Sequence, residues 1–158
     1  GLEHRIGGLE KDATTGNVSY DPDNHETMTD VRSRKISAIS QDIPELEVHG
    51  EGSDLLVLGW GSTYGAIRTA VNRVLKSGRQ VAHAHLRYVN PFPTNLKEVL
   101  ASYDRVLIPE INMGQLSRLI RAEFLVPTIG YNRVMGLPMK AREIEAEIHK
   151  VLDGEESE

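Results

Sequence analysis

Asp54-Leu-Leu-Val-Leu-Gly-Trp-Gly-Ser-Thr-Tyr-Gly-Ala-Ile67 is the stretch that decides the fold. Leu55 to Leu58 form a continuous apolar run, which is typical of a parallel strand that is covered on both faces. The two glycines that follow allow a sharp turn, and Ser62 or Thr63 is placed to cap a helix. Apolar residues then recur every three or four positions up to Gly78, a residue suited to end a helix. The stretch therefore predicts a strand, a glycine turn and a helix.

The same alternation of strands and helices continues to the end of the chain. Strands are predicted at residues 80–88, 105–108 and about 128–134, and a helix with one apolar side follows each of them. Thr94 is the expected cap of the helix after the second strand, and Pro138 precedes the last helix. This order favours the three-layer α/β/α class, with a mostly parallel, open sheet of about four or five strands between two layers of helices.

The first 50 residues carry different signals. Turn-forming residues are frequent up to about residue 35, which predicts an extended arm that orders by packing on another chain. Residues 24–39 are suited to one helix, with Asn24 or Thr27 as its cap. We therefore expect an arm with one helix over residues 1–50, an α/β domain over residues 51–153 and an acidic tail over residues 154–158.

The composition excludes several classes of function. The 158 residues include 23 acidic and 18 basic side chains that are interspersed, so the sequence lacks the basic cluster that nucleic-acid binding requires. The chain has no cysteine, which excludes disulfides and cysteine-ligated zinc or iron–sulfur sites within it. No apolar stretch approaches the roughly 20 residues of a membrane-spanning helix. These features suit a cytoplasmic protein that binds neither nucleic acid nor membranes.

The glycine turn departs from the known nucleotide-binding motifs. Its spacing, Gly59-x-Gly61-x-x-x-Gly65, is one residue longer than the dinucleotide fingerprint, and the next strand ends in Leu86-Arg-Tyr88 without an acidic residue for a ribose. The turn also lacks the Gly-Lys-Ser/Thr of a phosphate-binding loop. One alternative stays open, namely a stand-alone doubly wound binding module with an anion or nucleotide site at residues 59–65.

Polar residues and glycines follow the first three predicted strands. Because parallel strands end at the same edge of a sheet, these residues are expected to form one surface that serves subunit assembly or lines the active-site channel. For Arg87 and Glu110, an ion pair that braces the turns is expected at least as much as a catalytic role. No nucleophile with a partnered base is evident, so we predict no catalytic or cofactor-binding residue in this chain. The candidate residues are Gly61, Ser62, Arg87, Glu110, Asn112 and Gln115.

His83 and His85 lie two positions apart on the second predicted strand, so they share one face of the sheet. Two imidazoles on one face are potential metal ligands, but the spacing supplies no third ligand. Histidines in a buried strand are more often core or interface residues whose hydrogen bonds are satisfied. We therefore predict no metal site.

Motifs in both parts of the chain carry a resemblance to a known family. They are Gly59-Trp-Gly-Ser-Thr-Tyr-Gly65, Leu86-Arg-Tyr-Val-Asn-Pro-Phe-Pro93, Glu110-Ile-Asn-Met-Gly-Gln-Leu116, the opening Gly1-Leu-Glu-His4, Tyr20-Asp-Pro-Asp-Asn-His-Glu26 and Arg32-Ser-Arg-Lys35. With these motifs the chain resembles the C-terminal part of the α subunit of 2-oxoacid:ferredoxin oxidoreductases, and among them most of all the enzymes that use 2-oxoglutarate.

The resemblance implies a domain similar to the transketolase C-terminal domain, within a heterodimer or heterotetramer that also contains a β subunit. Such enzymes decarboxylate a 2-oxoacid, transfer the acyl group to CoA and reduce ferredoxin. Thiamine diphosphate, Mg and the iron–sulfur cluster are held by other parts, which implies that this chain alone folds but is inactive. The missing initial methionine also suggests a fragment or a processed product. Residues 5–15 make this segment longer than the usual linker of this family.

Overall fold

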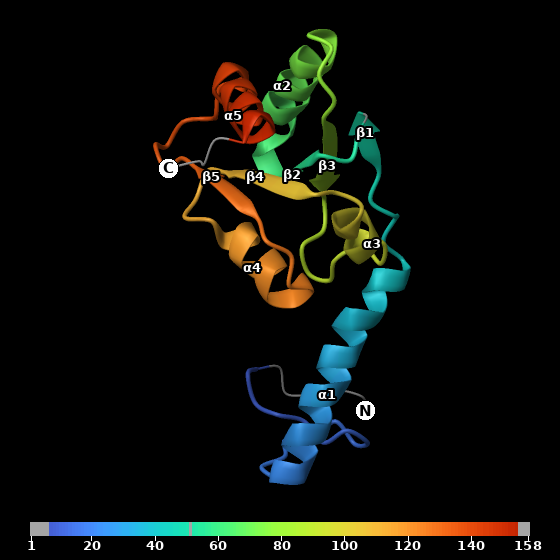
Figure 1. Ribbon diagram of the computed structural model, residues 1–158. Coiled ribbons are helices and arrows are strands. Elements are labelled where there is room, and N and C mark those ends of the chain that lie inside the picture. Colours follow the sequence, from blue (N-terminus) through green and yellow to red (C-terminus); the bar gives the residue numbers. More distant parts are fainter. Residues whose placement is uncertain (1–6, 51, 155–158) are drawn as a thin grey trace. The chain divides into compact units, whose positions relative to one another are not determined.

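The structure, a computed structural model, describes residues 7–50 and 52–154 (Figure 1). The chain divides into two compact units, and the boundary falls between Ile43 and Pro44. The opening motif at residues 1–4, the first part of the longer linker and residues 155–158 of the expected tail lie outside the described residues.

The second unit contains strands and helices in alternation. In chain order they are β1 (Val48–Gly50), β2 (Leu55–Trp60), α2 (Tyr64–Lys76), β3 (Ala82–Leu86), α3 (Leu96–Ala101), β4 (Arg105–Glu110), α4 (Gln115–Phe124), β5 (Ile129–Asn132) and α5 (Ala141–Asp153). Within the described residues, the five strands form one sheet in the order β1-β3-β2-β4-β5. All neighbouring strands are parallel except β1 and β3. The mostly parallel α/β sheet is thus confirmed.

Helices cover both faces of this sheet, which confirms the three-layer class. α2 and α5 pack on one face, and α3 and α4 pack on the other (Figure 1). The side chains of β2 alternate between the two layers: Leu55 and Val57 belong to the core under α2 and α5, and Leu56 and Leu58 to the core under α3 and α4. Because all four are buried, the apolar run is continuous.

β1 was not predicted from the sequence. Residues 1–50 were expected to form an arm with one helix, but Val48–Gly50 pairs with β3 and forms the antiparallel edge of the sheet. A strand of three residues is too short to give a periodic pattern. The segment that leads into this edge strand forms one wall of a groove.

The predicted helix caps of this unit are partly wrong. Thr63 is the N-cap residue of α2, yet its hydroxyl donates to the carbonyl of Trp60 at 2.8 Å, because Gly61–Thr63 already form a 3-10 turn. α3 begins after Asn95 instead of Thr94. The Asn95 amide exchanges two hydrogen bonds with the backbone of Leu46 and so fixes the segment before β1. Gly78, with φ of +84°, follows α2 as predicted.

The first unit is built around α1 (Pro22–Ala38), which continues into a short 3-10 turn (Ile39–Gln41). The helix begins earlier than predicted. Asp21 is the cap in place of Asn24 or Thr27, because its carboxylate accepts from the N–H groups of residues 23 and 24 and Pro22 is well suited to the first helical position.

The loop before α1 is held to the helix by two polar side chains. Asn24 accepts from the N–H of Ala13 at 3.0 Å and donates to the carbonyl of Lys11 at 2.9 Å. Glu10 accepts from both terminal nitrogens of Arg32 at 3.0 Å each. The guanidinium of Arg32 is the main reason why the pKa of Glu10 is lowered to about 2. Residues 10–38 are therefore folded against each other, although no side chain of α1 is buried.

Candidate functional site

The predicted surface lies at the carboxyl ends of three neighbouring parallel strands, in the order β3-β2-β4. Glu110 is the last residue of β4, Gln115 is the first residue of α4, and the other four candidate residues lie in the turns after the strands; the six differ in exposure. Gly61, Ser62, Arg87 and Gln115 are exposed, Asn112 is half-buried, and Glu110 is completely buried with 0% exposure. Five of the six are therefore accessible to a partner or a ligand.

Glu110 is the centre of the hydrogen bonds at the end of β4. Its carboxylate accepts from the indole Nε1 of Trp60 at 3.2 Å and from the side-chain amide of Asn112 at 3.1 Å. It also accepts from the backbone N–H groups of Leu116 at 2.9 Å and Ser117 at 3.0 Å, in the first turn of α4. A carboxylate at this position satisfies donors that a helix N-terminus leaves unpaired. Glu110 thus positions α4 and ties it to β2.

The expected ion pair between Arg87 and Glu110 is wrong. Side chains alternate along a strand, and Glu110 shares its side of the sheet with Ile108 and α4. Arg87 continues the row of His83 and His85 and lines a groove beside α2. β2 also separates the two strands concerned. The two residues come from one end of the sheet but belong to opposite faces.

Sequence reasoning missed the loop between β5 and α5 as part of the same surface. The N–H of Arg133 donates to the carbonyl of Glu110 at 2.9 Å, so this loop lies beside the turn after β4. Val134, Met135 and Leu137 follow, and between 62% and 65% of each residue is exposed. Three exposed apolar residues close together in a loop with Gly and Pro were a readable signal for an interface.

Gly114, in the turn after β4, has a conformation and a position that only glycine fits. Its φ of +79° is the left-handed conformation that favours glycine, and a Cβ there would lie 3.1 Å from the side-chain nitrogen of Asn132. Gly114 is buried, so it fits the turn to β5 and leaves no space for a ligand. By contrast, Gly61, with φ of +58°, has open space around it.

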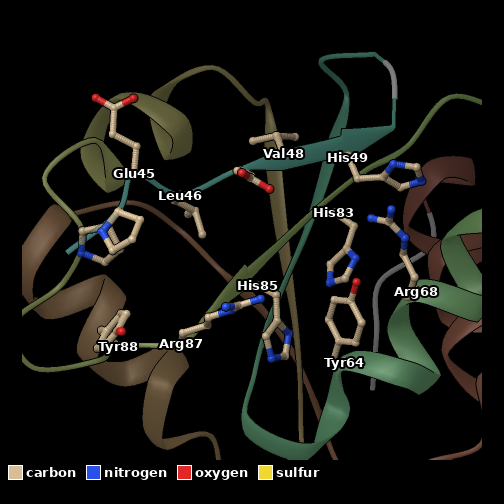
Figure 2. A pocket seen from close by; sticks show the side chains of 13 residues that line it. Glu45, Leu46, Val48, His49, Tyr64, Arg68, His83, His85, Arg87 and Tyr88 are labelled. Carbon is tan, nitrogen blue, oxygen red and sulfur yellow. The ribbon is translucent and has the colours of Figure 1, made fainter.

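A groove of about 820 Å³ lies at the edge of the sheet, between β1, β3 and the first turns of α2 (Figure 2). One wall is the segment before β1 together with β1 itself, and the other side is formed by β3, the turn after it and α2. The lining residues are Pro44, Glu45, Leu46, Glu47, Val48, His49, Tyr64, Arg68, His83, His85, Arg87, Tyr88 and Pro93.

His83 is the most unusual residue of this groove. It is only 2% exposed, and neither ring nitrogen has a hydrogen-bond partner among the described residues. Its ring centroid lies 5.7 Å from that of Tyr64 and 6.0 Å from that of His85. Burial, followed by the charges of neighbouring His85 and Arg68, lowers the pKa of His83 to about 3. His83 is thus buried, as expected of a core or interface histidine, but its hydrogen bonds are not satisfied by the described residues.

His85 is fixed in one tautomer by its surroundings. Its Nε2 lies 3.2 Å from the carbonyl of Gly61, which only accepts, so Nε2 carries the proton. Gly59 pairs with His85 across the sheet, and a Cβ at Gly59 would lie 2.9 Å from Nδ1. Burial lowers the pKa of His85, and the contact with Gly61 opposes this effect. The first glycine of the turn is thus required by the packing of this imidazole.

Arg68, Tyr64 and His49 complete the groove and were not predicted as site residues. Figure 2 shows the three side chains grouped around His83. Tyr64 and Arg68 are four positions apart on α2 and so share a face of the helix. The register His49↔His83 brings the third residue in from β1. Only the helical spacing was readable in the sequence, because the strand pairing is non-local.

Metal-ligand clusters and membrane-spanning helices are both absent from the part of the chain that the structure describes. Residues 7–50 and 52–154 contain no group of three or more His, Asp or Glu side chains with the geometry of a metal site. In this same part of the chain, no helix has the length and the apolar character needed to cross a membrane.

Comparison with known proteins relates the chain to 2-oxoacid oxidoreductases. It matches the family of pyruvate:ferredoxin oxidoreductase core domain II over residues 53–144. It is 47% identical over 156 residues to the 2-oxoglutarate oxidoreductase subunit KorA of Mycobacterium tuberculosis, an alignment that covers 98% of this chain and 24% of that subunit.

Solved structures give the same result. The 2-oxoglutarate:ferredoxin oxidoreductase from Magnetococcus marinus with 2-oxoglutarate, coenzyme A and succinyl-CoA bound matches with a TM-score of 0.85 and 32% identity, over 94% of this chain and 26% of that one. A split-gene transketolase, in an inactive tetramer, matches with a TM-score of 0.51 and 16% identity over 68% of this chain and 41% of that one, which shows a shared fold.

These findings define an α/β domain of the transketolase-like class that occurs in oxidoreductase subunits. The chain belongs to the pyruvate:ferredoxin oxidoreductase core domain II family. It spans about a quarter of the length of the 2-oxoglutarate relatives that it matches. The resemblance to 2-oxoacid:ferredoxin oxidoreductases is confirmed.

Proposed function

We propose that this chain forms the C-terminal domain of the α subunit of a cytoplasmic 2-oxoglutarate:ferredoxin oxidoreductase. The proposed enzyme decarboxylates 2-oxoglutarate oxidatively, forms succinyl-CoA and reduces ferredoxin. One observation carries the proposal: the identity to the mycobacterial 2-oxoglutarate oxidoreductase subunit extends through almost the entire chain and so includes both units.

The work of this domain within the enzyme is assembly of the subunits. Gly61, Ser62, Arg87, Asn112 and Gln115 form a polar surface at the carboxyl end of the sheet. The exposed apolar residues of the β5–α5 loop extend it, and apolar groups next to amides and a guanidinium are the composition of a protein interface. We expect this surface to contact the remainder of the α subunit or the β subunit, and to form part of the wall of the active-site channel.

The residues of this chain do not fit the cofactors of the enzyme. The chain has no cysteine, so it contains no thiolate ligand for an iron–sulfur cluster. Glu110, the buried carboxylate at the end of β4, accepts from four donors and is completely buried, so it is not accessible to Mg. We infer that other domains hold the cluster, Mg and thiamine diphosphate. The isolated chain is expected to bind neither thiamine diphosphate nor NAD, and micromolar binding of either in calorimetric titration would contradict this.

The first unit is expected to pack on another part of the enzyme. α1 buries none of its side chains, and Tyr20 beside it is 86% exposed. A helix without a buried face gains little stability from its own chain. In the isolated chain, limited chymotrypsin digestion should cut within residues 7–43 before it cuts within residues 52–154. The assembled enzyme should protect this unit; cleavage of the sheet before the first unit would show that the organisation is wrong.

The test of the proposed function is reconstitution with the missing parts. Co-expression with the remainder of the α subunit and the β subunit should give a complex that reduces ferredoxin when 2-oxoglutarate and CoA are both present. Leu137→Asp, on the apolar loop, should reduce complex yield and turnover together. The matched control is Lys76→Asp, an exposed residue at the end of α2 and thus at the opposite end of the sheet.

The outcomes separate the parts of the proposal. A complex that turns over pyruvate but not 2-oxoglutarate would refute the substrate. Normal assembly and turnover of Leu137→Asp would refute the surface. The alternative of a stand-alone module with an anion or nucleotide site at residues 59–65 has no comparable support, because the groove is lined by Tyr64 and not by the glycines of the turn.

A further inference from the structure

The groove at the edge of the sheet has the size of a small-molecule site. Its volume of about 820 Å³ lies within the usual range of roughly 300–1,000 Å³ for ligand pockets. It is formed within the second unit alone, because all of its lining residues follow position 43. Three imidazoles and two guanidiniums also line this one groove, and they come from β1, β3, the turn after β3 and α2.

His83 points to a ligand that hydrogen-bonds. A buried polar side chain is normally paired, because leaving it unpaired costs roughly 1–3 kcal/mol. Both ring nitrogens of His83 lack a partner among the described residues, although the ring lines the groove. The core explanation fails for the same reason, since an apolar residue would pack equally well there without this cost. An acceptor within the groove would pair with the N–H that the neutral imidazole always carries.

The positive charges that line the groove indicate that its ligand is an anion. Arg68 and Arg87 form no ion pair with any described residue. His83 lies near enough to Arg68 for that charge to lower its pKa, so the field at the imidazole is positive. The two carboxylates of the groove, Glu45 and Glu47, are exposed on the segment before β1. The cationic side of the groove is therefore the one formed by α2 and the turn after β3, and the carboxylates lie on the segment before β1.

We propose that this groove is a binding site for a small molecule that carries an oxyanion, either a carboxylate or a phosphate. His83 donates a hydrogen bond to the oxyanion, and Arg68 and Arg87 neutralise its charge. Tyr64 lies against the imidazoles of both His83 and His85 and so keeps their ring planes fixed. A metal ion is a poor occupant by the same reasoning, because two guanidiniums repel it and the three imidazoles, like every other set of His, Asp or Glu side chains among the described residues, do not form a group that could hold one. Arg87 is also part of the assembly surface proposed above, whereas Arg68 and His83 belong to the groove alone.

The experiment uses the complete 158-residue chain and three probes, namely inorganic phosphate, pyrophosphate and succinate. Binding is measured by calorimetry, and the ring signals of His83 are followed by NMR during the same titration. Saturable binding is expected for at least one probe, with a His83 signal that shifts at the same midpoint. Comparison of succinate with the two phosphates identifies whether the oxyanion is a carboxylate or a phosphate.

Variants of opposite charge give the result a sign. Arg68→Gln and Arg87→Gln should each weaken binding by roughly tenfold to a hundredfold, the usual effect of losing a hydrogen bond to a charged group. Glu47→Gln, which removes a like charge, should strengthen it. Arg118→Gln is the matched control, because Arg118 is exposed on α4 beyond the opposite face of the sheet. The proposal is overturned if no probe binds saturably at about 10 mM, or if Arg68→Gln behaves like Arg118→Gln.

Discussion

Replacing Glu110 by alanine is expected to destabilise the second unit by about 3–5 kcal/mol. The substitution removes the acceptor of two backbone N–H groups in the first turn of α4, at Leu116 and Ser117, and both residues are buried. Each such donor costs roughly 1–3 kcal/mol when it is left unpaired. The indole of Trp60 loses its acceptor as well. Small domains have only about 5–15 kcal/mol of total stability, so this loss is a large fraction.

A more conservative substitution at Glu110 should cost less stability than alanine. Glu110→Gln keeps the size of the side chain and one accepting oxygen, but it directs an NH2 group toward one of the two backbone donors. We expect a smaller loss of about 1–3 kcal/mol. Glu123→Ala is the control, because Glu123 is exposed on the same helix, and surface substitutions usually stay within about 0.5 kcal/mol.

The assay is urea unfolding followed by circular dichroism and by the fluorescence of Trp60, the single tryptophan of the chain. The free energy of unfolding should decrease in the order Glu123→Ala, Glu110→Gln, Glu110→Ala. If Glu110→Ala stays within about 1 kcal/mol of the control, the carboxylate does not support α4 and the reasoning is refuted. The expected destabilisation also means that Glu110 variants are poor probes of the assembly surface, for which Arg87→Ala is better suited.

Three further predictions concern a glycine and two titrating side chains. Gly59→Ala should destabilise the chain by about 1–3 kcal/mol in the same unfolding assay, because the new Cβ would lie 2.6 Å from Ile67 Cδ1. By contrast, a Cβ at Gly65 would have nothing within 4 Å, so Gly65→Ala should stabilise α2 by up to about 1 kcal/mol. The pKa of Glu10 is lowered from 4.5 to about 2 in the folded chain, so its contacts with α1 should be intact above pH 4.5 and weaken as the pH falls toward 2. The weakening should appear as faster amide exchange in the loop before α1, and this pH dependence should vanish in Glu10→Gln. The pKa of His83 is lowered from 6.5 to about 3 in the folded chain. Between these pH values the unfolded chain binds a proton that the folded chain does not, so the free energy of unfolding should fall as the pH decreases from 6.5 toward 3. An unchanged pH dependence of the stability in His83→Phe would contradict this.

The elements that the sequence predicted well depend on residues close together in the chain. The apolar run at residues 55–58 marked a strand buried on both faces, and spacings of three and four marked α2, α4 and α5. Gly78 marked the end of α2 through its own backbone requirement. Helix periodicity and turn chemistry act over about four residues, so a linear pattern contains the information needed.

The details of the helix ends needed more than the local pattern. The residue types alone made three positions plausible caps, namely Asn24, Thr63 and Thr94. In the structure, Asp21 is the N-cap of α1, Asn95 is the N-cap of α3, and the side chain of Thr63 makes no cap hydrogen bond to α2. Asp21 and Asn95 are chosen by their surroundings, since Pro22 favours the start of α1 and Leu46 binds the Asn95 amide. Several residues near a helix start have suitable side chains, and tertiary contacts decide between them.

The sequence by itself thus determined the class of the fold, the candidate turns at one end of the sheet and the family to which the motifs belong. Only the tertiary structure decided that Glu110 points toward α4 and Arg87 toward the groove, and that His49, Arg68 and His83 meet there. These arrangements depend on the strand order and on the register between strands, which join residues far apart in the chain. A shift of one residue in register would reverse every side chain of a strand, and no local pattern of residues specifies the partner against which that register is set.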